Sequence, residues 1–141
     1  MNQPEILIVG AGGMGALFGS ILHENGLKVV LYDTNTEHIR AIQQAGLKIE
    51  GYGGDRTIPI AATSNLSELE SAEIIIFQCK SHGTRQAAKA VKPLITQESV
   101  CISFQNGLGN EEVMAEELGN DSVMGGLTAM AGVLLGPGKI R

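Results

Sequence analysis

The chain begins with a short apolar run that ends abruptly at a cluster of glycines. Residues 6–9 are consecutive aliphatic residues, a pattern typical of a strand covered on both faces, as in a parallel sheet between helices. Beyond the glycines, apolar residues recur at the spacing of one helix face, and Gly26 offers an end for that helix. The residues on that face are Met14, Leu17, Phe18, Ile21 and Leu22. The pattern predicts a strand, a glycine turn and an amphipathic helix.

Apolar runs and amphipathic segments go on alternating along the chain. Further strands are predicted at residues 28–32, 73–79 and 100–104, and further helices at residues 36–45, 81–93 and 110–118. Asn110 is the expected N-cap of the last helix. The weaker signals are two small strands joined by a turn within 47–60, a helical turn at 67–71, and one strand within 123–135 that leads to a turn at 136–138.

This alternation of strands and helices calls for a mostly parallel sheet with right-handed crossovers. We therefore predict the α/β class, with a Rossmann-type doubly wound sheet, helices on both faces, and one domain that covers residues 1–141. In such a fold the ligand-binding loops follow the carboxyl ends of the strands, above the point where the strand order reverses.

The cluster Gly10-x-Gly12-x-x-Gly15 has the spacing of a dinucleotide-binding turn. Gly10 would let the backbone turn out of the strand, Gly12 would remove a Cβ that collides with a diphosphate, and Gly15 would let helix and strand approach closely. Backbone amides at the helix N-terminus would then face the anion. The cofactor-binding candidates in this turn are Gly10, Ala11, Gly12, Gly13, Met14 and Gly15. Glycine-rich turns without a ligand are common, so the motif needs support from its context.

Asp33 supplies that context, because it closes the second predicted strand about 20 residues after the glycines, where the motif expects an acid. A carboxylate at this place accepts hydrogen bonds from the adenosine ribose hydroxyls and repels an additional 2′-phosphate. Alternatively, Asp33 only precedes the next helix, for which Thr34 and Glu37 have the spacing of a capping box. The order of strand, turn, helix, strand and acid favours dinucleotide binding.

Lys80 and Asn106 also follow predicted strands, so the fold would bring both to the edge that holds the glycine turn. Lys80 would place an ammonium group at the mouth of the cofactor crevice, where it could contact the adenosine ribose, a 2′-phosphate or the substrate. Otherwise it is a surface lysine at a strand end. Asn106 both donates and accepts, which suits a nicotinamide ribose hydroxyl or a substrate hydroxyl or carboxylate. Alternatively, Asn106 and Gly107 are simply a turn pair.

The histidines and cysteines favour structural interpretations. His82 is expected at an exposed helix start, and His23 and His38 on solvated helix surfaces rather than in catalysis. Cys79 and Cys101 border apolar runs and are expected as small core residues, which suits a reducing compartment. The sequence shows no metal-ligand spacing, so we expect no metal site.

Composition narrows the classes of partner. The net charge of −5 and the scattered basic residues argue against nucleic-acid binding. No stretch approaches the roughly 20 apolar residues needed to cross a bilayer. The first residues lack basic side chains ahead of the apolar run, so we expect no secretory signal and a cytoplasmic location.

Three motifs together resemble the N-terminal domain of the ketopantoate reductase (2-dehydropantoate 2-reductase) family. They are the glycine turn at 10–15, Phe-Gln-Cys-Lys at 77–80, and Gln-Asn-Gly-Leu-Gly at 105–109 before an acidic helix. The resemblance covers essentially the whole chain. It implies an oxidoreductase that uses NADPH to reduce 2-dehydropantoate to pantoate, a step toward pantothenate and coenzyme A. It also implies that Lys80 contacts the cofactor and that Asn106 lies near the nicotinamide and the substrate.

The sequence departs from the family in two respects. Many members carry a basic residue near the end of the second strand, whereas this chain has Asp33, so NAD(H) competes with NADP(H) as the expected cofactor. The resemblance also implies a helical C-terminal domain that supplies the general-acid lysine and a substrate-binding glutamate, and we expect that domain to lie outside residues 1–141. We therefore expect no catalytic residue in residues 1–141 and little turnover by this chain alone. Apolar surface that this domain would cover could instead be buried between two copies of the chain, so a homodimer is also possible.

Two other functions remain open. One is a stand-alone module that senses NAD(H) or binds a partner without chemistry. The other is the cofactor domain of a different dehydrogenase, acting on another small 2-oxo acid or a sugar acid.

Overall fold

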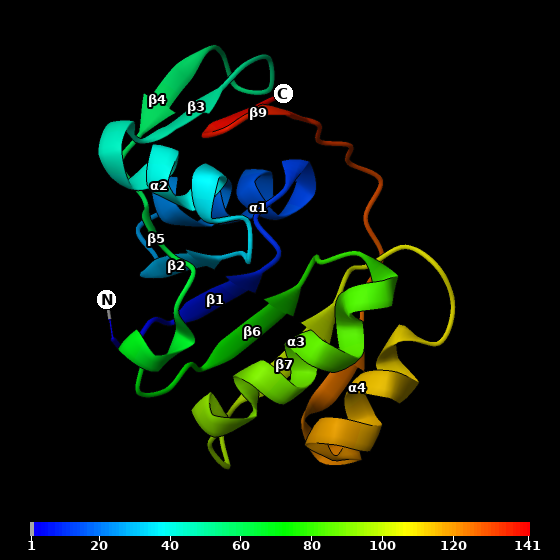
Figure 1. The fold of residues 1–141 in the computed structure, drawn as a ribbon. Coiled ribbons are helices and arrows are strands. Elements are labelled where there is room, and N and C mark those ends of the chain that lie inside the picture. Colours follow the sequence, from blue (N-terminus) through cyan, green and yellow to red (C-terminus); the bar gives the residue numbers. More distant parts are fainter. Residues whose placement is uncertain (1) are drawn as a thin grey trace.

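The larger of two sheets forms the centre of the structure, a computed structural model that describes residues 2–141 (Figure 1). Its six strands are all parallel and lie in the order β5-β2-β1-β6-β7-β8. They are β1 (Ile6–Val9), β2 (Val29–Tyr32), β5 (Ala61–Thr63), β6 (Ile74–Phe77), β7 (Val100–Ser103) and β8 (Val123–Gly125). The order reverses between β1 and β6, which is the switch point of a doubly wound sheet. The predicted fold class is confirmed.

Two pairs of helices cover the faces of this sheet, as Figure 1 shows. On one face lie α1 (Gly13–Glu24) and α2 (Thr36–Ala45), and on the other lie α3 (Thr84–Val91) and α4 (Asn110–Leu118). The predicted helices therefore form, although α3 is shorter than expected. It is flanked by the 3₁₀ turns Ser81–Gly83 and Lys92–Leu94. Further 3₁₀ turns span Leu66–Glu68 and Asn120–Ser122.

Strand β1 is buried on both faces because its side chains alternate between two cores. Ile6 and Ile8 belong to the core under α1 and α2, whereas Leu7 and Val9 belong to the core under α3 and α4. All four are at most 5% exposed. This double burial explains why the strand is an unbroken aliphatic run rather than an alternation of polar and apolar residues.

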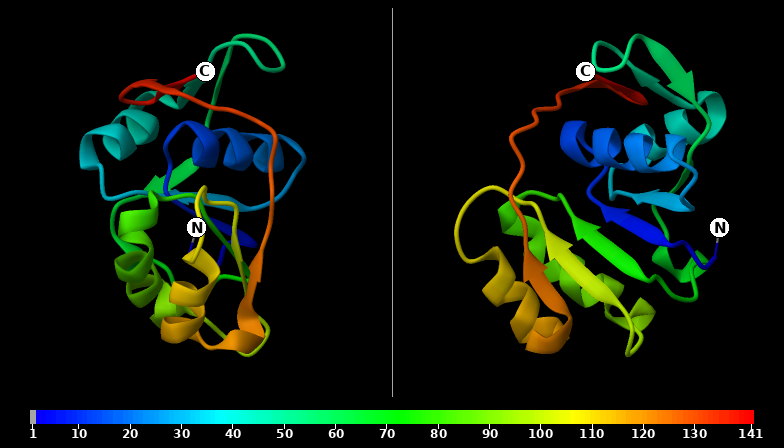
Figure 2. Two further views of the ribbon diagram at one scale, coloured as in Figure 1. Left: turned by 90° about the vertical axis from the view of Figure 1, so that its right-hand side faces the viewer. Right: turned by 180° about the vertical axis from the view of Figure 1, so that it is seen from behind.

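A smaller sheet covers the outer side of α1 and α2, so the molecule has four layers (Figures 1 and 2). Its order is β4-β3-β10-β9, with β3 and β10 parallel and the two outer pairs antiparallel. The strands are β3 (Leu47–Ile49), β4 (Arg56–Ile58), β9 (Leu134–Gly136) and β10 (Lys139–Ile140). Buried residues of this sheet complete the core around α1 and α2, namely Leu47, Ile49, Ile58 and Ile140.

The prediction of one strand within 123–135 is wrong. β8 ends at Gly125 in the large sheet, and β9 begins at Leu134 in the small one. The chain between them, which we term the crossing segment (residues 126–133), runs from one sheet to the other, as the orange-to-red trace in Figure 2 shows. Strand β5 was not predicted, because Ala61-Ala62-Thr63 contains no large apolar side chain.

Two predicted helix caps are also wrong. Asn35, not Thr34, caps α2, since its side chain accepts a hydrogen bond from the His38 amide. At α4 the N-cap is Gly109, and the Asn110 side chain lies inside the protein instead of capping the helix. Polar side chains with better partners elsewhere do not serve as local caps.

Candidate functional site

The predicted site residues meet along one edge of the large sheet. The turn Gly10–Gly15 follows β1, Asp33 follows β2, Lys80 comes shortly after β6, and Asn106 comes shortly after β7. These strands are neighbours in the order β2-β1-β6-β7, and all are parallel, so their carboxyl ends share an edge. The edge contains the switch point, where open α/β sheets bind ligands.

Gly10 and Gly15 are required by close packing of the backbone. Gly10 has φ +102°, and a Cβ there would overlap the backbone of Gln78 and Cys79, which follow β6. A Cβ on Gly15 would overlap the Gly10 carbonyl oxygen and also press on the side chain of Ile8. The two glycines therefore let the turn leave β1 sharply and let α1 lie close to the sheet, as their spacing predicted.

Gly12 is different, because a Cβ built on it meets nothing within 4 Å. Its backbone is extended, with φ −70° and ψ −162°, a conformation open to any residue. Among the residues that the structure describes, no group accepts a hydrogen bond from the amides of Gly12, Gly13 or Met14. Open space beside Gly12 and these amides at the N-terminus of α1 together form a cradle suited to an anion.

Asp33 braces this cradle from the end of β2. Its Oδ2 accepts a hydrogen bond of 2.7 Å from the Ala11 amide, and its Oδ1 accepts one of 2.9 Å from the Asn35 amide. The residue is half-buried, and each carboxylate oxygen can accept a further bond. Asp33 therefore holds the turn and still presents a negative charge at the edge of the site.

Lys80 and Asn106 both expose their side chains at this edge. Within residues 2–141 neither side chain has an ion pair or a hydrogen bond. The backbone of Asn106 is held, since its carbonyl oxygen accepts bonds from Ser81 Oγ at 2.8 Å and Asn110 Nδ2 at 3.0 Å. The asparagine is thus fixed through its backbone, while its side chain is available to a ligand.

A polar network behind Asn106 joins the loops that follow β6 and β7. Gln105 Nε2 donates to Thr84 Oγ1 at 2.7 Å and to the Cys79 carbonyl oxygen at 2.9 Å. Thr84 Oγ1 donates to Asn110 Oδ1 at 3.2 Å. Thr84 is 1% exposed and Asn110 is 4% exposed, so these bonds lie out of solvent. The network fixes the position of Asn106 relative to the end of β6.

The crossing segment passes directly over the first turn of α1. A Cβ on Gly132 would overlap the Gly13 carbonyl oxygen, and a Cβ on Gly13 would overlap the Gly132 backbone. Through this contact the crossing segment forms one side of the glycine cradle. Phe104, which directly follows β7, packs edge-on against Phe18 of α1 with ring centroids 5.3 Å apart.

Buried ionisable groups near the edge are kept neutral. Burial raises the pKa of the Cys79 thiol, and it raises the pKa of the Tyr32 hydroxyl, where the Asp33 charge acts in the same direction. Burial also raises the pKa of Cys101 to about 11. The cysteines are therefore core thiols rather than nucleophiles, as expected. In the described part of the chain, no group of three His, Cys, Asp or Glu side chains could hold a metal ion.

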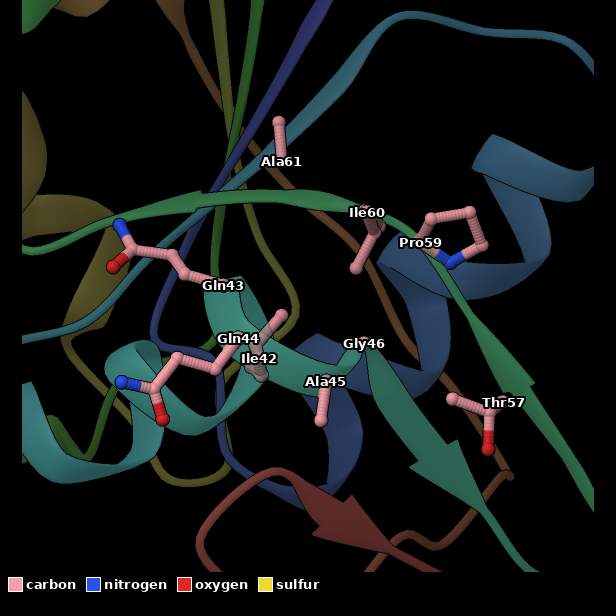
Figure 3. A pocket seen from close by; sticks show the side chains of 9 residues that line it. All are labelled: Ile42, Gln43, Gln44, Ala45, Gly46, Thr57, Pro59, Ile60 and Ala61. Atoms are coloured by element: carbon pink, nitrogen blue, oxygen red, sulfur yellow. The ribbon is translucent and has the colours of Figure 1, made fainter.

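A hollow of about 570 Å³ lies at the opposite edge of the sheet (Figure 3). It is lined by the end of α2 and by the chain from Pro59 to Ala61, which leads into the amino end of β5. Figure 3 shows the Gln43 side chain reaching from α2 toward the chain that follows Ala61, where Gln43 Nε2 donates to the Ala62 carbonyl oxygen at 2.8 Å. Since the hollow is at the amino ends of the strands, it is separate from the glycine cradle.

Three contributors to the site were not predicted from the sequence. His38 was expected on a solvated surface, but it is 1% exposed and contacts the glycine turn. Its position four residues before Ile42, on the apolar face of α2, was a signal for burial. Thr84 lies in the buried network, and Gly132 touches the turn through a contact distant in sequence, which no local pattern reveals.

Comparison with known proteins relates the whole chain to one family. The profile of the family described as "Ketopantoate reductase PanE/ApbA" matches residues 6–141. The 2-dehydropantoate 2-reductase of Pyrococcus abyssi is 35% identical over 97% of this chain and 44% of its own length. That of Lactococcus lactis is 32% identical over 97% of this chain and 45% of its own length.

A solved structure has a very similar fold. The ternary structure of D-mandelate dehydrogenase with NADH and anilino(oxo)acetate has a TM-score of 0.91 and 27% identity, over 96% of this chain and 44% of that one. The chain therefore spans less than half the length of the proteins that it matches. No helix among residues 2–141 is long and apolar enough to cross a membrane.

Proposed function

This chain belongs to the ketopantoate reductase PanE/ApbA family, and from that premise we propose that it binds a nicotinamide dinucleotide along the glycine edge, as the cofactor-binding part of a 2-oxo acid reductase. The observation that carries the proposal is the cradle at Gly12. The space that a side chain of residue 12 would fill is open, because residue 12 is glycine. The amides of Gly12, Gly13 and Met14 beside that space have no hydrogen-bond partner among the described residues. A dinucleotide diphosphate is an anion that fits such a cradle at a switch point.

The other site residues would bind the sugars and the ring. Asp33 would accept hydrogen bonds from the adenosine ribose, because its oxygens retain lone pairs after bonding Ala11 and Asn35. Lys80 would contact the same half of the cofactor. Asn106 would bond the nicotinamide ribose or the substrate, held there by Ser81 and Asn110.

The bound nicotinamide would supply a hydride for reduction of a substrate carbonyl. The residues of this chain bind and orient the reactants. No proton donor is assigned to residues 1–141. We propose that a lysine outside residues 1–141, in the helical C-terminal domain that the family resemblance implies, protonates the substrate oxygen. The relatives, of which this chain covers about 45%, are long enough to hold such a domain. The chain alone would then bind cofactor and turn over little substrate.

For the cofactor we propose NADH over NADPH. The carboxylate of Asp33 would lie beside the ribose, where the 2′-phosphate of NADPH would bring further negative charge. The neighbouring D-mandelate dehydrogenase structure, which contains NADH, supports the same choice. Lys80 is the one site residue whose charge would favour the 2′-phosphate.

For the substrate we propose 2-dehydropantoate, the 2-oxo acid in the name of the curated relatives, with a step toward pantothenate and coenzyme A as its place in metabolism. Another 2-oxo acid is the second candidate, favoured by the close similarity of fold to D-mandelate dehydrogenase. The reducing cytoplasm is the proposed location, supported by the free thiols of Cys79 and Cys101.

Calorimetric titration of NADH into the 141-residue chain and its Gly12→Ala variant tests the proposal. The variant should fold, since a Cβ at residue 12 meets no protein atom within 4 Å, but its methyl group should lower NADH affinity roughly tenfold or more by occupying the diphosphate space. Gly136→Ala is the matched control, because Gly136 is equally open but lies in β9. Equal affinity in Gly12→Ala and Gly136→Ala would contradict the assignment of the cradle.

A further inference from the structure

His38 joins the glycine turn to the turn between β9 and β10. It lies in the first turn of α2 and is 1% exposed. Its Nε2 is 2.6 Å from the Ala11 carbonyl oxygen, and its Nδ1 is 2.9 Å from the Gly138 amide nitrogen. Two backbone groups that are distant in sequence therefore meet on one buried ring.

These partners determine which ring nitrogen carries the proton. The Gly138 amide can only donate a hydrogen bond, so Nδ1 accepts. The proton of the neutral ring is then on Nε2, which donates to the Ala11 carbonyl oxygen. Both nitrogens are occupied, and the ring is shielded from solvent. His38 is therefore suited to hold the backbone in place and not to transfer protons.

Fixing the Ala11 carbonyl also fixes the Gly12 amide. The two groups belong to one planar trans peptide, in which C=O and N–H point in opposite directions. Because the carbonyl points at His38, the Gly12 N–H points away from His38, on the side where it has no partner among the described residues. The preceding peptide is held as well, through the bond from the Ala11 amide to Asp33.

We propose that His38 is a positioning residue that aims the Gly12 amide at the dinucleotide diphosphate and couples this amide to the β9–β10 turn. This inference rests on the proposed function, because it assumes that an anion binds in the cradle. By linkage, a ligand that orders the Ala11–Gly12 peptide also stabilises the contact of His38 with Gly138. Conversely, loosening the β9–β10 turn lowers the affinity for that ligand.

Two substitutions separate the halves of this contact. The amide of Asn reaches about as far as Nδ1 of histidine and that of Gln about as far as Nε2, because Gln has one more methylene group. His38→Gln therefore keeps a donor for the Ala11 carbonyl, whereas His38→Asn keeps only an acceptor for the Gly138 amide. His23→Asn, in the last turn of α1, is a matched control for the change of residue type.

The experiment is titration of NADH into the wild-type chain and these variants, with melting temperatures recorded alongside. We expect His38→Asn to weaken NADH binding roughly tenfold, the effect of one misdirected hydrogen bond, and His23→Asn to leave it unchanged. His38→Gln loses only the Gly138 contact, so it should weaken binding by no more than the coupling between the two contacts, about threefold. Affinity that is unchanged in both His38 variants, or lowered equally in both, would overturn the inference. If wild type binds neither NADH nor NADPH, the proposed function itself fails.

Amide hydrogen exchange of the wild-type chain tests the coupling even if a variant does not fold. We expect NADH to slow exchange of the Gly138 amide roughly threefold more than exchange of the Glu50 amide, the same factor that His38→Gln should lose in affinity. Glu50 is the control because its amide donates to the Ile140 carbonyl in the same small sheet, without contact to His38. Equal slowing at Gly138 and Glu50 would contradict the coupling.

Discussion

The Oδ2 atom of Asp33 lies 2.7 Å from the backbone nitrogen of Ala11, so the acid that ends β2 holds the turn that follows β1. The same carboxylate accepts the Asn35 amide through Oδ1. Asp33 thus has a structural task that needs no ligand. Its charge is a separate property, and it is the charge that would discriminate between NADH and NADPH.

Replacing Asp33 by asparagine should shift cofactor preference toward NADPH. Asn keeps an oxygen that can accept the Ala11 amide, but it removes the charge that opposes the 2′-phosphate. We expect the ratio of NADH to NADPH affinity to fall roughly tenfold, as for the loss of one close charge repulsion near a surface. Asp33→Arg should shift it further. The measurement is titration with both dinucleotides.

Asp55→Asn is the control for that comparison. Asp55 also accepts a backbone amide, that of Gly51, but it lies in the exposed turn between β3 and β4. Its substitution should leave the affinity ratio unchanged. A ratio in Asp33→Asn equal to that in Asp55→Asn would show that Asp33 does not select the cofactor.

Gly15→Ala should destabilise the chain far more than Gly12→Ala. The added Cβ would overlap the Gly10 carbonyl oxygen, a backbone atom that cannot move without displacing β1 or α1. We expect the free energy of unfolding to fall by about 3 kcal/mol or more, as for severe overpacking. Gly12→Ala should cost about 1 kcal/mol, since alanine is a poorer N-cap than glycine. Urea denaturation followed by circular dichroism measures both, and similar losses would contradict the packing described here.

Thr84→Val should loosen the loop that carries Asn106. The substitution keeps the shape of the side chain but leaves Asn110 Oδ1 without its donor and Gln105 Nε2 without one acceptor, in a buried place. An unsatisfied buried group costs about 1–3 kcal/mol, so the free energy of unfolding should fall by that amount. Thr57→Val, on the exposed side of β4, is the control. If both variants are equally stable, the network has no energetic role.

Cys101 should make the stability of the fold depend on alkaline pH. Its pKa is raised from about 9 to about 11 by burial, so the unfolded chain loses the thiol proton at lower pH than the folded chain. The contribution of this thiol to the free energy of unfolding is therefore fully present below pH 9. It declines by about 2 kcal/mol as the pH rises toward 11.

Cys101→Ala isolates this contribution. The free energy of unfolding of wild type minus that of the variant should decline across this pH range, because other titrating groups are common to both proteins. A difference that does not change with pH would mean that the thiol titrates alike in the folded and unfolded chains.

The sequence predicted those parts of the fold that have local signals. The aliphatic run at Ile6–Val9 predicted β1, because burial on both faces restricts that strand to apolar residues. The glycine spacing predicted the turn, because backbone crowding excludes side chains there, and the apolar periodicity predicted α1. The placement of Asp33, Lys80 and Asn106 at one edge followed from the fold class, since parallel strands bring their carboxyl ends together.

Contacts between distant segments could not be predicted in this way. The chain after β8 was taken for a single strand because it is apolar, yet Gly132 lies against Gly13 and the segment crosses to a second sheet. His38 was expected in solvent because histidine is polar, yet its two partners are backbone groups at Ala11 and Gly138. Backbone partners leave no sequence signature.

Dinucleotide binding in the glycine cradle is tested most directly by following backbone amide resonances of the ¹⁵N-labelled chain while NADH is added. We predict that the resonances of the Gly12, Gly13 and Met14 amides shift most, and that those of amides beside the hollow at Ala61 do not shift. If saturating NADH leaves the resonances of these three amides unchanged, or shifts only those of residues away from the carboxyl edge of the large sheet, the cofactor does not bind in the glycine cradle.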